Sequence, residues 1–337
     1  RPARKESSAA SDVYKRQGLS ELGHRSLSQS KDELEMNIPT TINAYAVALA
    51  DLGHHVYLGT ETGQITRNLP IDGLQAFIRA NHEYESTEAT FLIPGLVSDE
   101  MTALALISAL QQSSTGLCRF VVSEGQIQAK ASLLVGEFLT AARLQAWWRR
   151  SLDEVEQWYA QALAYSIISS SNTTSVPARL QPQGEVLDIF SDVASPDAQK
   201  CESVTVERVE MCMARLTGVM PETRMAGNFQ VVETSIGGQF LDIEVAENEL
   251  RFTIGSSLNN QHPALSTALA QAINQLHVFE PAPTAFVLDS GEHVELYTRA
   301  VVDTSVGLDD QALLNAIQKW GPYVYDFNER IFAQLQG

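Results

Sequence analysis

The sequence predicts an α+β fold built from two tandem repeats, each in the order helix, β-hairpin, helix, β-hairpin, helix. Three observations support this prediction. Helix-like and strand-like hydrophobic periodicities alternate along the chain. The same order of elements returns about 165 residues later. Apolar residues make up 44% of the 337 residues, which is enough for a core in each of two ordinary domains.

Each repeat opens with a one-sided helix that ends at a glycine. In residues 37–53 apolar side chains recur every three or four positions, with Pro39 near the start and Gly53 just past the end. Residues 203–218 repeat this arrangement and end at Gly218. We therefore expect these two segments to be equivalent helices.

Two hairpins follow in each repeat. Residues 74–80 and 239–245 alternate apolar and polar side chains, as half-buried strands do, and each leads through a polar turn to another strand. A second hairpin is expected at 118–135 and at 284–302, where a glycine supplies each tight turn. Aligning these later hairpins matches Phe120 with Phe286.

Two further helices complete each repeat. The middle helix is expected at 98–112 and 260–276, and the closing helix at 140–165 and 308–335. We expect Gly321-Pro322 to bend or break the last helix, because proline removes a backbone donor inside a helix.

Composition divides the chain into four parts. They are a lead-in at 1–35, a first domain at 36–168, a linker at 169–202 and a second domain at 203–337. The linker is rich in Ser, Thr, Asn and Pro, which disfavour packed structure. Its apolar island at 186–190 is suited to docking on its own chain or on a partner, and the sequence leaves both open.

The lead-in is expected to be non-native or disordered. Residues 1–17 look like translated sequencing-adaptor read-through, and such segments are excluded from fold reasoning. Residues 18–35 are polar with little periodicity, which makes Met36 the expected native start.

The charge balance and the cysteines exclude several classes of protein. With 23 Lys and Arg against 41 Asp and Glu, the net charge of −18 argues against nucleic acid or an anionic membrane as the main partner. No run approaches the ~18 apolar residues that a membrane-spanning helix needs. Three cysteines in no metal or disulfide spacing favour a reducing, cytoplasmic compartment.

No motif predicts an enzyme, a metal site or a cofactor. The histidines show no metal-binding spacing, and His54-His55 is interpreted as an exposed turn between a helix and a strand. Phosphate-binding glycine loops and nucleophile elbows are absent. Cys118 and Cys212 fit buried positions better than activated thiols. An enzyme of unrecognised chemistry is therefore the least favoured hypothesis.

Aromatic residues and one strand face are the candidates for protein binding, because aromatics dominate binding hot spots. Core packing is the alternative for the tryptophans, and a solvated sheet face is the alternative for Tyr297 and Arg299. The candidates are Trp147, Trp148, Trp158, Trp320, Tyr323, Tyr297 and Arg299.

The end of the second repeat carries a family resemblance. Val294-Glu295-Leu296-Tyr297-Thr298-Arg299 and the helix start Gly307-Leu308-Asp309-Asp310 resemble the typical close of YbjN-domain proteins. The order of elements also resembles that of type III secretion chaperones. The first repeat departs from this pattern, with Lys130-Ala131-Ser132 in place of Tyr297-Thr298-Arg299.

This resemblance implies a non-catalytic adaptor or chaperone-like protein of the bacterial cytoplasm. It implies a protein client and no cofactor, and two fused copies would form an intramolecular pseudo-dimer. Further association into a homodimer stays open. The alternative is a regulatory protein of signal transduction that senses a small ligand, and a fold alone does not decide between these functions.

Overall fold

The computed structural model describes residues 48–58, 62–81, 86–113, 116–134, 141–168, 202–227, 229–259, 264–279 and 283–336. The chain divides into two units, Arg1–Thr41 and Ile42–Gly337, and all described residues lie in the second. The expected lead-in, most of the first predicted helix and nearly all of the expected linker lie outside the described residues. Below, the first half means the described residues up to 168, and the second half those from 202.

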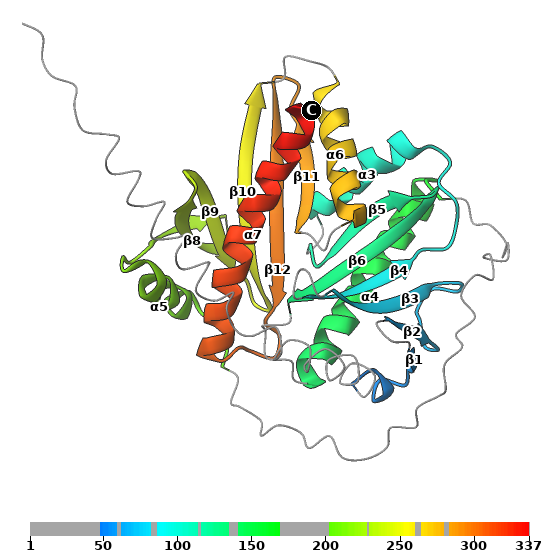
Figure 1. Cartoon of the computed structure of the whole chain (residues 1–337), viewed down its shortest axis with the longest axis horizontal. Helices are drawn as coiled ribbons and strands as arrows, with labels where there is room; N and C mark the ends of the chain where they lie inside the picture. The colour runs from blue at the N-terminus through cyan, green and yellow to red at the C-terminus, as the bar shows by residue number, and fades with distance from the viewer. Residues whose placement is uncertain are drawn as a thin grey trace, which may run out of the picture. The chain divides into compact units, whose positions relative to one another are not determined.

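The first half contains a six-stranded antiparallel sheet with the strand order β1-β2-β3-β4-β6-β5 (Figure 1). Its helices are α3 (Glu100–Ser113) and α4 (Ala141–Ala164). Its strands are β1 (His55–Leu58), β2 (Thr62–Thr66), β3 (Gln75–Asn81), β4 (Ser86–Leu92), β5 (Cys118–Ser123) and β6 (Gln126–Leu134).

The second half contains another six-stranded antiparallel sheet, in which β7 to β12 follow the same order, β7-β8-β9-β10-β12-β11. Its helices are α5 (Val206–Thr217), α6 (Leu265–Phe279) and α7 (Asp310–Gln336). Its strands are β7 (Glu222–Ala226), β8 (Phe229–Ile236), β9 (Gln239–Val245), β10 (Glu249–Asn259), β11 (Thr284–Asp289) and β12 (His293–Asp303).

The predicted α+β class is confirmed, and the four predicted hairpins are present. The predicted strand number is wrong, because each sheet has two additional strands, β1–β2 and β7–β8. Strand β7 lies at a sheet edge, and its side chains are exposed or half-buried on both faces. It therefore lacks the period-two hydrophobic alternation by which strands are recognised in a sequence.

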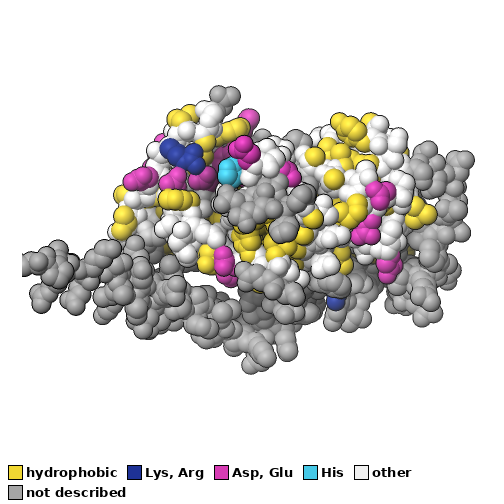
Figure 2. Space-filling view, turned by 90° about the horizontal axis from the view of Figure 1, so that it is seen from above, with side chains coloured by type: hydrophobic (Ala, Val, Ile, Leu, Met, Phe, Trp, Pro, Cys, Tyr) yellow, Lys and Arg dark blue, Asp and Glu magenta, His cyan; other side chains and the backbone are white. Residues whose placement is uncertain are grey.

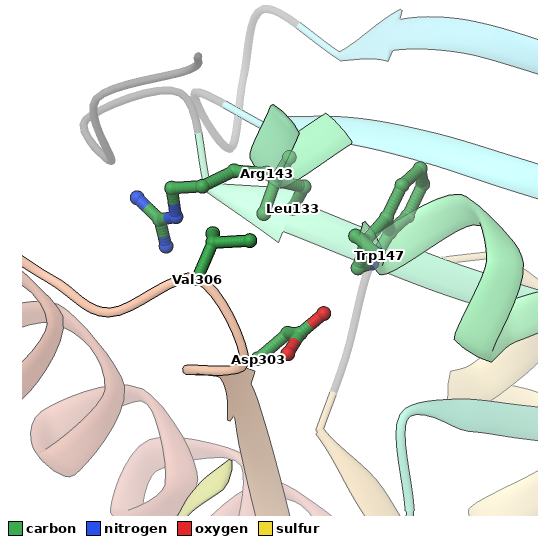
Figure 3. Close-up of a pocket in the computed structure, with 5 residues that line it drawn as sticks. All are labelled: Leu133, Arg143, Trp147, Asp303 and Val306. Atoms are coloured by element: carbon green, nitrogen blue, oxygen red, sulfur yellow. The ribbon is translucent and has the colours of Figure 1, made fainter. Parts of the chain in front are cut away.

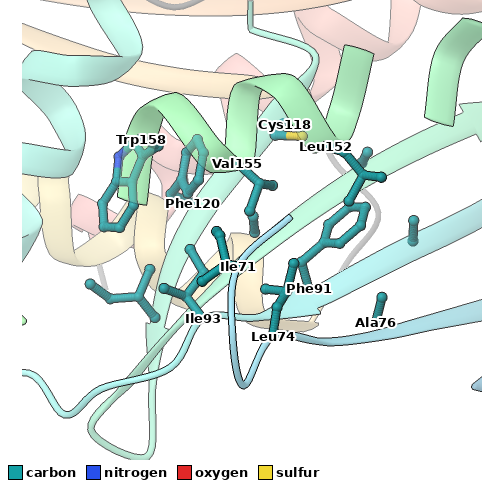
Figure 4. Close-up of a cluster of buried hydrophobic side chains, with 14 of the residues drawn as sticks. Ile71, Leu74, Ala76, Phe91, Ile93, Cys118, Phe120, Leu152, Val155 and Trp158 are labelled. Atoms are coloured by element: carbon teal, nitrogen blue, oxygen red, sulfur yellow. The ribbon is translucent and has the colours of Figure 1, made fainter. Parts of the chain in front are cut away.

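Helix α4 covers the core of the first half. Trp158 stacks on Phe120 with ring centroids 4.6 Å apart, and Val155 and Leu152 follow along the same helix face (Figure 4). Apolar side chains at this three- and four-residue spacing bury one stripe of a helix against a sheet. The sequence pattern of α4 therefore places its tryptophans on the core side.

Helix α7 continues through Pro322, so a break at this position is wrong. Trp320 precedes the proline and Val324 and Phe327 follow it, and all three side chains are buried in hydrophobic clusters. Burial on both sides of Pro322 offsets the one backbone hydrogen bond that a proline removes.

The sequence match of Phe120 with Phe286 is also wrong in three dimensions. Phe120 points into the core beneath α4, whereas Phe286 lies on the other face of its sheet and stacks on Tyr297 at 5.4 Å. Ala285 occupies the core side of β11 instead. One residue of slip along a strand exchanges its two faces, and chemical similarity between two phenylalanines does not reveal such a slip.

The two halves meet through their outermost strands, β5 and β11, and through their middle helices. Ser108 of α3 contacts the backbone of Val287 on β11: Oγ donates to the carbonyl at 3.1 Å and accepts from N–H at 2.8 Å. Asn274 of α6 does the same for Val122 on β5, with bonds of 2.9 and 2.8 Å. Each middle helix thus caps the edge strand of the opposite half.

Gln111 extends this joint along α3. In the orientation of its side-chain amide that satisfies both ends, the amide oxygen accepts a hydrogen bond from the Phe120 N–H. The amide nitrogen donates one to the Ala285 carbonyl, and both donor–acceptor distances are 2.9 Å. It therefore links β5 of its own half to β11 of the other half. Thr284 adds a bond of 3.0 Å from its hydroxyl to the Gly116 carbonyl.

Replacing Asn274 with alanine tests this joint. Asn274→Ala leaves the buried N–H and carbonyl of Val122 without their partner, and such groups cost about 1–3 kcal/mol when unsatisfied. We expect a loss of about 2 kcal/mol in the free energy of unfolding, measured by urea denaturation. Gln275→Ala, an exposed position on the same helix, is the control and should change it by less than about 0.5 kcal/mol. Equal midpoints for Asn274→Ala and Gln275→Ala would contradict the capping role.

Candidate protein-binding surface

The four tryptophans among the candidates are buried. Trp147, Trp148, Trp158 and Trp320 are between 0% and 4% exposed and belong to the two large hydrophobic cores. Tyr323 is half-buried and packs beside Trp320 with ring centroids 5.8 Å apart. These residues therefore build the cores, as the core-packing alternative states, and present no open groove in the part of the chain described.

His54 is buried, so its interpretation as an exposed turn residue is wrong, while His55 is exposed. The Trp148 indole N–H donates to His54 Nε2 at 3.1 Å, and His54 Nδ1 lies 2.9 Å from the Arg67 carbonyl. Nε2 must then accept and Nδ1 must donate, which defines the neutral tautomer with the proton on Nδ1. The indole N–H thus satisfies the ring nitrogen that burial of His54 would otherwise leave without a hydrogen bond.

Tyr297 and Arg299 lie together on one face of the second sheet. We call the face of the second sheet opposite α5 and α7 the outer face. Its side chains alternate with core residues such as Leu296 and Thr298, which are fully buried. Tyr297 and Arg299 are both half-buried there, beside Phe286.

Aromatic side chains form a row across this face. The Tyr297 ring stacks on Phe286 and also covers Gly255 on the paired strand β10, where an added Cβ would lie 3.0 Å from the ring. Phe240 on β9 is on the same face and is 69% exposed. Phe229 on β8 is 43% exposed, with the Arg251 guanidinium 5.8 Å from its ring centroid.

Sequence reasoning missed Phe240 and Phe229. The alternation of residues 239–245 places Leu241, Ile243 and Val245 in the core and Asp242 and Glu244 on the opposite, polar side. Phe240 has the same parity as Asp242. An apolar residue at a position predicted to be solvated was the available signal, because large exposed aromatics commonly mark contact surfaces.

Arg299 has an unusual environment for a cation. Its guanidinium lies 5.1 Å from the centre of the Phe286 ring, and its Nε is buried without a hydrogen-bond partner. Burial lowers the pKa of Arg299, and the nearby charge of Arg251 lowers it further. Arginine nevertheless stays protonated, so this charge is held in place by stacking on the aromatic ring.

The other arginines of the outer face are paired. Arg224 bridges Glu233 at 2.9 Å and Asp242 at 2.7 Å. Arg251 bridges Glu244 at 2.7 Å and also contacts Glu249. These cross-strand pairs connect β7, β8, β9 and β10 and place a charged band beside the aromatic row.

Arg150 connects α4 to this band from the first half. It donates to Asp303 at 2.9 Å, to Glu249 at 2.5 Å and to the Asn248 carbonyl at 2.8 Å. Burial opposes the charge of Arg150, but Asp303 and Glu249 outweigh that effect and raise its pKa. Both carboxylates are more than nine-tenths buried, and Arg150 compensates the charge of Asp303 and, together with Arg251, that of Glu249.

A small pocket lies next to this ion cluster (Figure 3). Leu133, Arg143 and Trp147 line it from the first half, and Asp303 and Val306 from the second. Its volume of about 10 Å³ is close to the space that one water molecule requires. This pocket is therefore too small for the small ligand of the alternative hypothesis.

The described residues show no group of histidine, cysteine and carboxylate side chains that could hold a metal ion. Burial raises the pKa of Cys118 well above its usual value, and Glu154 raises it further. Burial also raises the pKa of Cys212. Both thiols thus have the opposite of an activated cysteine environment. Nor does any helix in the described ranges have the length and hydrophobicity needed to span a membrane.

Figure 2 shows Asp and Glu side chains on both sides of the visible surface, with hydrophobic side chains between them and fewer Lys and Arg. This distribution agrees with the net charge of −18.

Comparisons with known proteins give weak matches. No family model matches the chain, and no curated protein does. The solved ExsC–ExsE complex aligns at 17% identity with a TM-score of 0.32, over 40% of this chain and 98% of that one. The HopA1–SchA chaperone–effector complex aligns at 12% identity with a TM-score of 0.30, over 37% of this chain and 94% of that one. Both likenesses are too weak to assign a function.

His277 is the described histidine most fully withdrawn from solvent, at 0% exposure. Its Nε2 lies 2.9 Å from the Pro283 carbonyl, and its ring stacks on Phe327 at 5.3 Å. Burial lowers the pKa of His277 to about 3, and the charges of Arg119 and Lys130 contribute. The folded protein therefore keeps this ring neutral.

Stability should consequently depend on pH through His277. Between pH 6.5 and 3 the unfolded chain binds a proton at this residue and the folded chain does not, so stability falls as the pH falls. From pH 7 to pH 5 the wild type should lose about 2 kcal/mol more than His277→Gln, measured by urea denaturation at both values. His293→Gln, an exposed histidine, should keep the wild-type slope. An unchanged slope in His277→Gln would show that this ring does not cause the effect.

Proposed function

We propose that this chain is a non-catalytic protein-binding adaptor or chaperone-like protein, with its partner docking on the outer face of the second sheet. The observation that carries the proposal is the exposure of Phe240 and Phe229, at 69% and 43%, on the outer face of the second sheet. Large exposed aromatics on one face favour a contact with another protein, since burying them is the main source of binding energy there.

Tyr297 and Arg299 complete this docking surface in our proposal. The Tyr297 ring and the Arg299 guanidinium both stack on Phe286, so a partner would meet side chains that are already ordered before binding. Preorganised contacts lose less conformational entropy on association. In the same proposal the tryptophans and Tyr323 support the surface from within the cores.

We further propose that the halves are descendants of one duplicated unit and act as a pseudo-dimer of YbjN-domain or type III secretion chaperone type. The common strand order and the reciprocal capping by Ser108 and Asn274 support this. The domains would be 36–168 and 203–337, joined by a linker at 169–202. A cytoplasmic setting fits the free thiols of Cys118 and Cys212.

A paired substitution tests the docking surface. Phe240→Ser with Phe229→Ser removes the exposed aromatics while leaving the core face of the sheet unchanged. In a pull-down from a native extract at moderate salt, we expect the double variant to retain at least about tenfold less of the stoichiometric partner than the wild type.

The matched control is Leu96→Ser with Met211→Ser, which removes two apolar side chains that are 55% and 70% exposed elsewhere. This control should retain the partner at the wild-type level. Undiminished binding by the Phe240 and Phe229 variant, or equal loss in the control, would refute the outer face as the docking surface.

A further inference from the structure

The strands of the outer face carry more carboxylates than arginines. The arginines are Arg224, Arg251 and Arg299. The carboxylates are Glu222, Glu233, Asp242, Glu244, Glu249, Glu295 and Asp303. Even with Arg150 added from α4, acidic groups remain in excess.

The arginines of this face are not free to bind a partner's carboxylate. Arg224, Arg251 and Arg150 each already bridge two carboxylates. Arg299 stacks on Phe286 and passes Gly116, where an added Cβ would lie 3.2 Å from its side chain. The charges of Glu244 and Glu249 favour the Arg299 cation from nearby, so it too is partly balanced.

Two carboxylates of the face take part in no ion pair with any residue that the structure describes. Glu222 is exposed on β7, opposite Glu233 on β8. Glu295 accepts a hydrogen bond of 2.9 Å from the Tyr297 hydroxyl and takes part in no ion pair among the described residues. Phe240 lies between these positions in strand order, on β9 between β8 and β10.

The pKa of Tyr297 is affected by carboxylates of the same face. Burial raises the pKa of Tyr297, and Glu295 and Asp242 raise it further. The carboxylates that raise this pKa therefore lie close to Tyr297, and the charge of Arg299 opposes their effect.

We infer that the outer face binds an extended partner segment whose face-side positions combine hydrophobic residues with Lys or Arg, the hydrophobic ones packing on Phe240 and Tyr297 and the cations pairing with Glu222 and Glu295. This inference rests on the proposed function. Successive side chains of an extended segment point to opposite sides, so the hydrophobic and basic residues that meet this face occupy every second position of the segment. The net charge of −18 attracts a basic segment and repels a second copy of this acidic chain.

Labelled synthetic peptides test the inference on the full chain. Three peptides of about ten residues, roughly two strand lengths, carry the residues under test at every second position, with serine between them. These positions hold Val and Lys in turn in the Lys–Val peptide, Val and Glu in the Glu–Val peptide, and Lys and Ser in the Lys–Ser peptide. Binding is measured by fluorescence anisotropy at about 0.05 M and 0.3 M salt, where surface charges are screened to different extents. We expect tight binding of the Lys–Val peptide alone, weakened by high salt.

Variants assign that binding to named residues. Glu222→Gln with Glu295→Gln should weaken the Lys–Val peptide about fivefold and flatten its salt dependence. Glu156→Gln with Glu247→Gln removes the same charge from exposed sites on α4 and in the β9–β10 turn, and should leave affinity within about twofold. Phe240→Ser should weaken the peptide at least about tenfold.

The inference is overturned if the Glu–Val or Lys–Ser peptide binds as tightly as the Lys–Val peptide. It is also overturned if Glu222→Gln with Glu295→Gln binds like the wild type. The experiments distinguish failure of this inference from failure of the proposed function. A native partner whose capture requires Phe240 and Phe229, combined with no preference for the Lys–Val peptide, would leave the docking surface standing and remove only its basic specificity.

Discussion

The structure depends on a constraint at the joint between its halves: the buried backbone of each edge strand needs hydrogen-bond partners that its own sheet does not supply. Ser108 and Asn274 supply them, each reaching from a middle helix to the opposite half. A buried N–H or carbonyl without a partner is costly, so each half completes the other. This makes the two sheets one body, in agreement with the single unit Ile42–Gly337.

An ion cluster reinforces the same joint. Arg150 on α4 pairs with Glu249 and Asp303 of the second half, all of them largely withdrawn from water. The joint thus combines neutral hydrogen bonds with a buried charge cluster, and neither is a simple hydrophobic contact. Because the helices and tryptophans face the two cores, the outer face of the second sheet is left to bear the exposed aromatics.

The sequence predicted the strongly periodic elements well and the sheet edges poorly. Helices α4 and α7 and hairpin β11–β12 combine length with clear periodicity, so local pattern and tertiary burial agree there. Strand β7 has side chains exposed on both faces, which leaves no pattern to read. For the proposed docking surface, Tyr297 and Arg299 were predicted from their shared strand face. Phe240 was missed because the alternation around it predicted a polar position.

The amino-acid sequence alone determined the fold class, the order of most elements, the acidic surface and the absence of recognisable catalytic motifs, because these follow from composition and local periodicity. Only the tertiary structure decided which side chains are covered. Trp148 and His54 are buried because they meet each other. Phe286 lies on the outer face of its sheet, where it is also buried, because β11 pairs with β12 in one register and not its neighbour. Such outcomes depend on residues far apart in the chain, and a local pattern carries no information about which distant group will fill a given space.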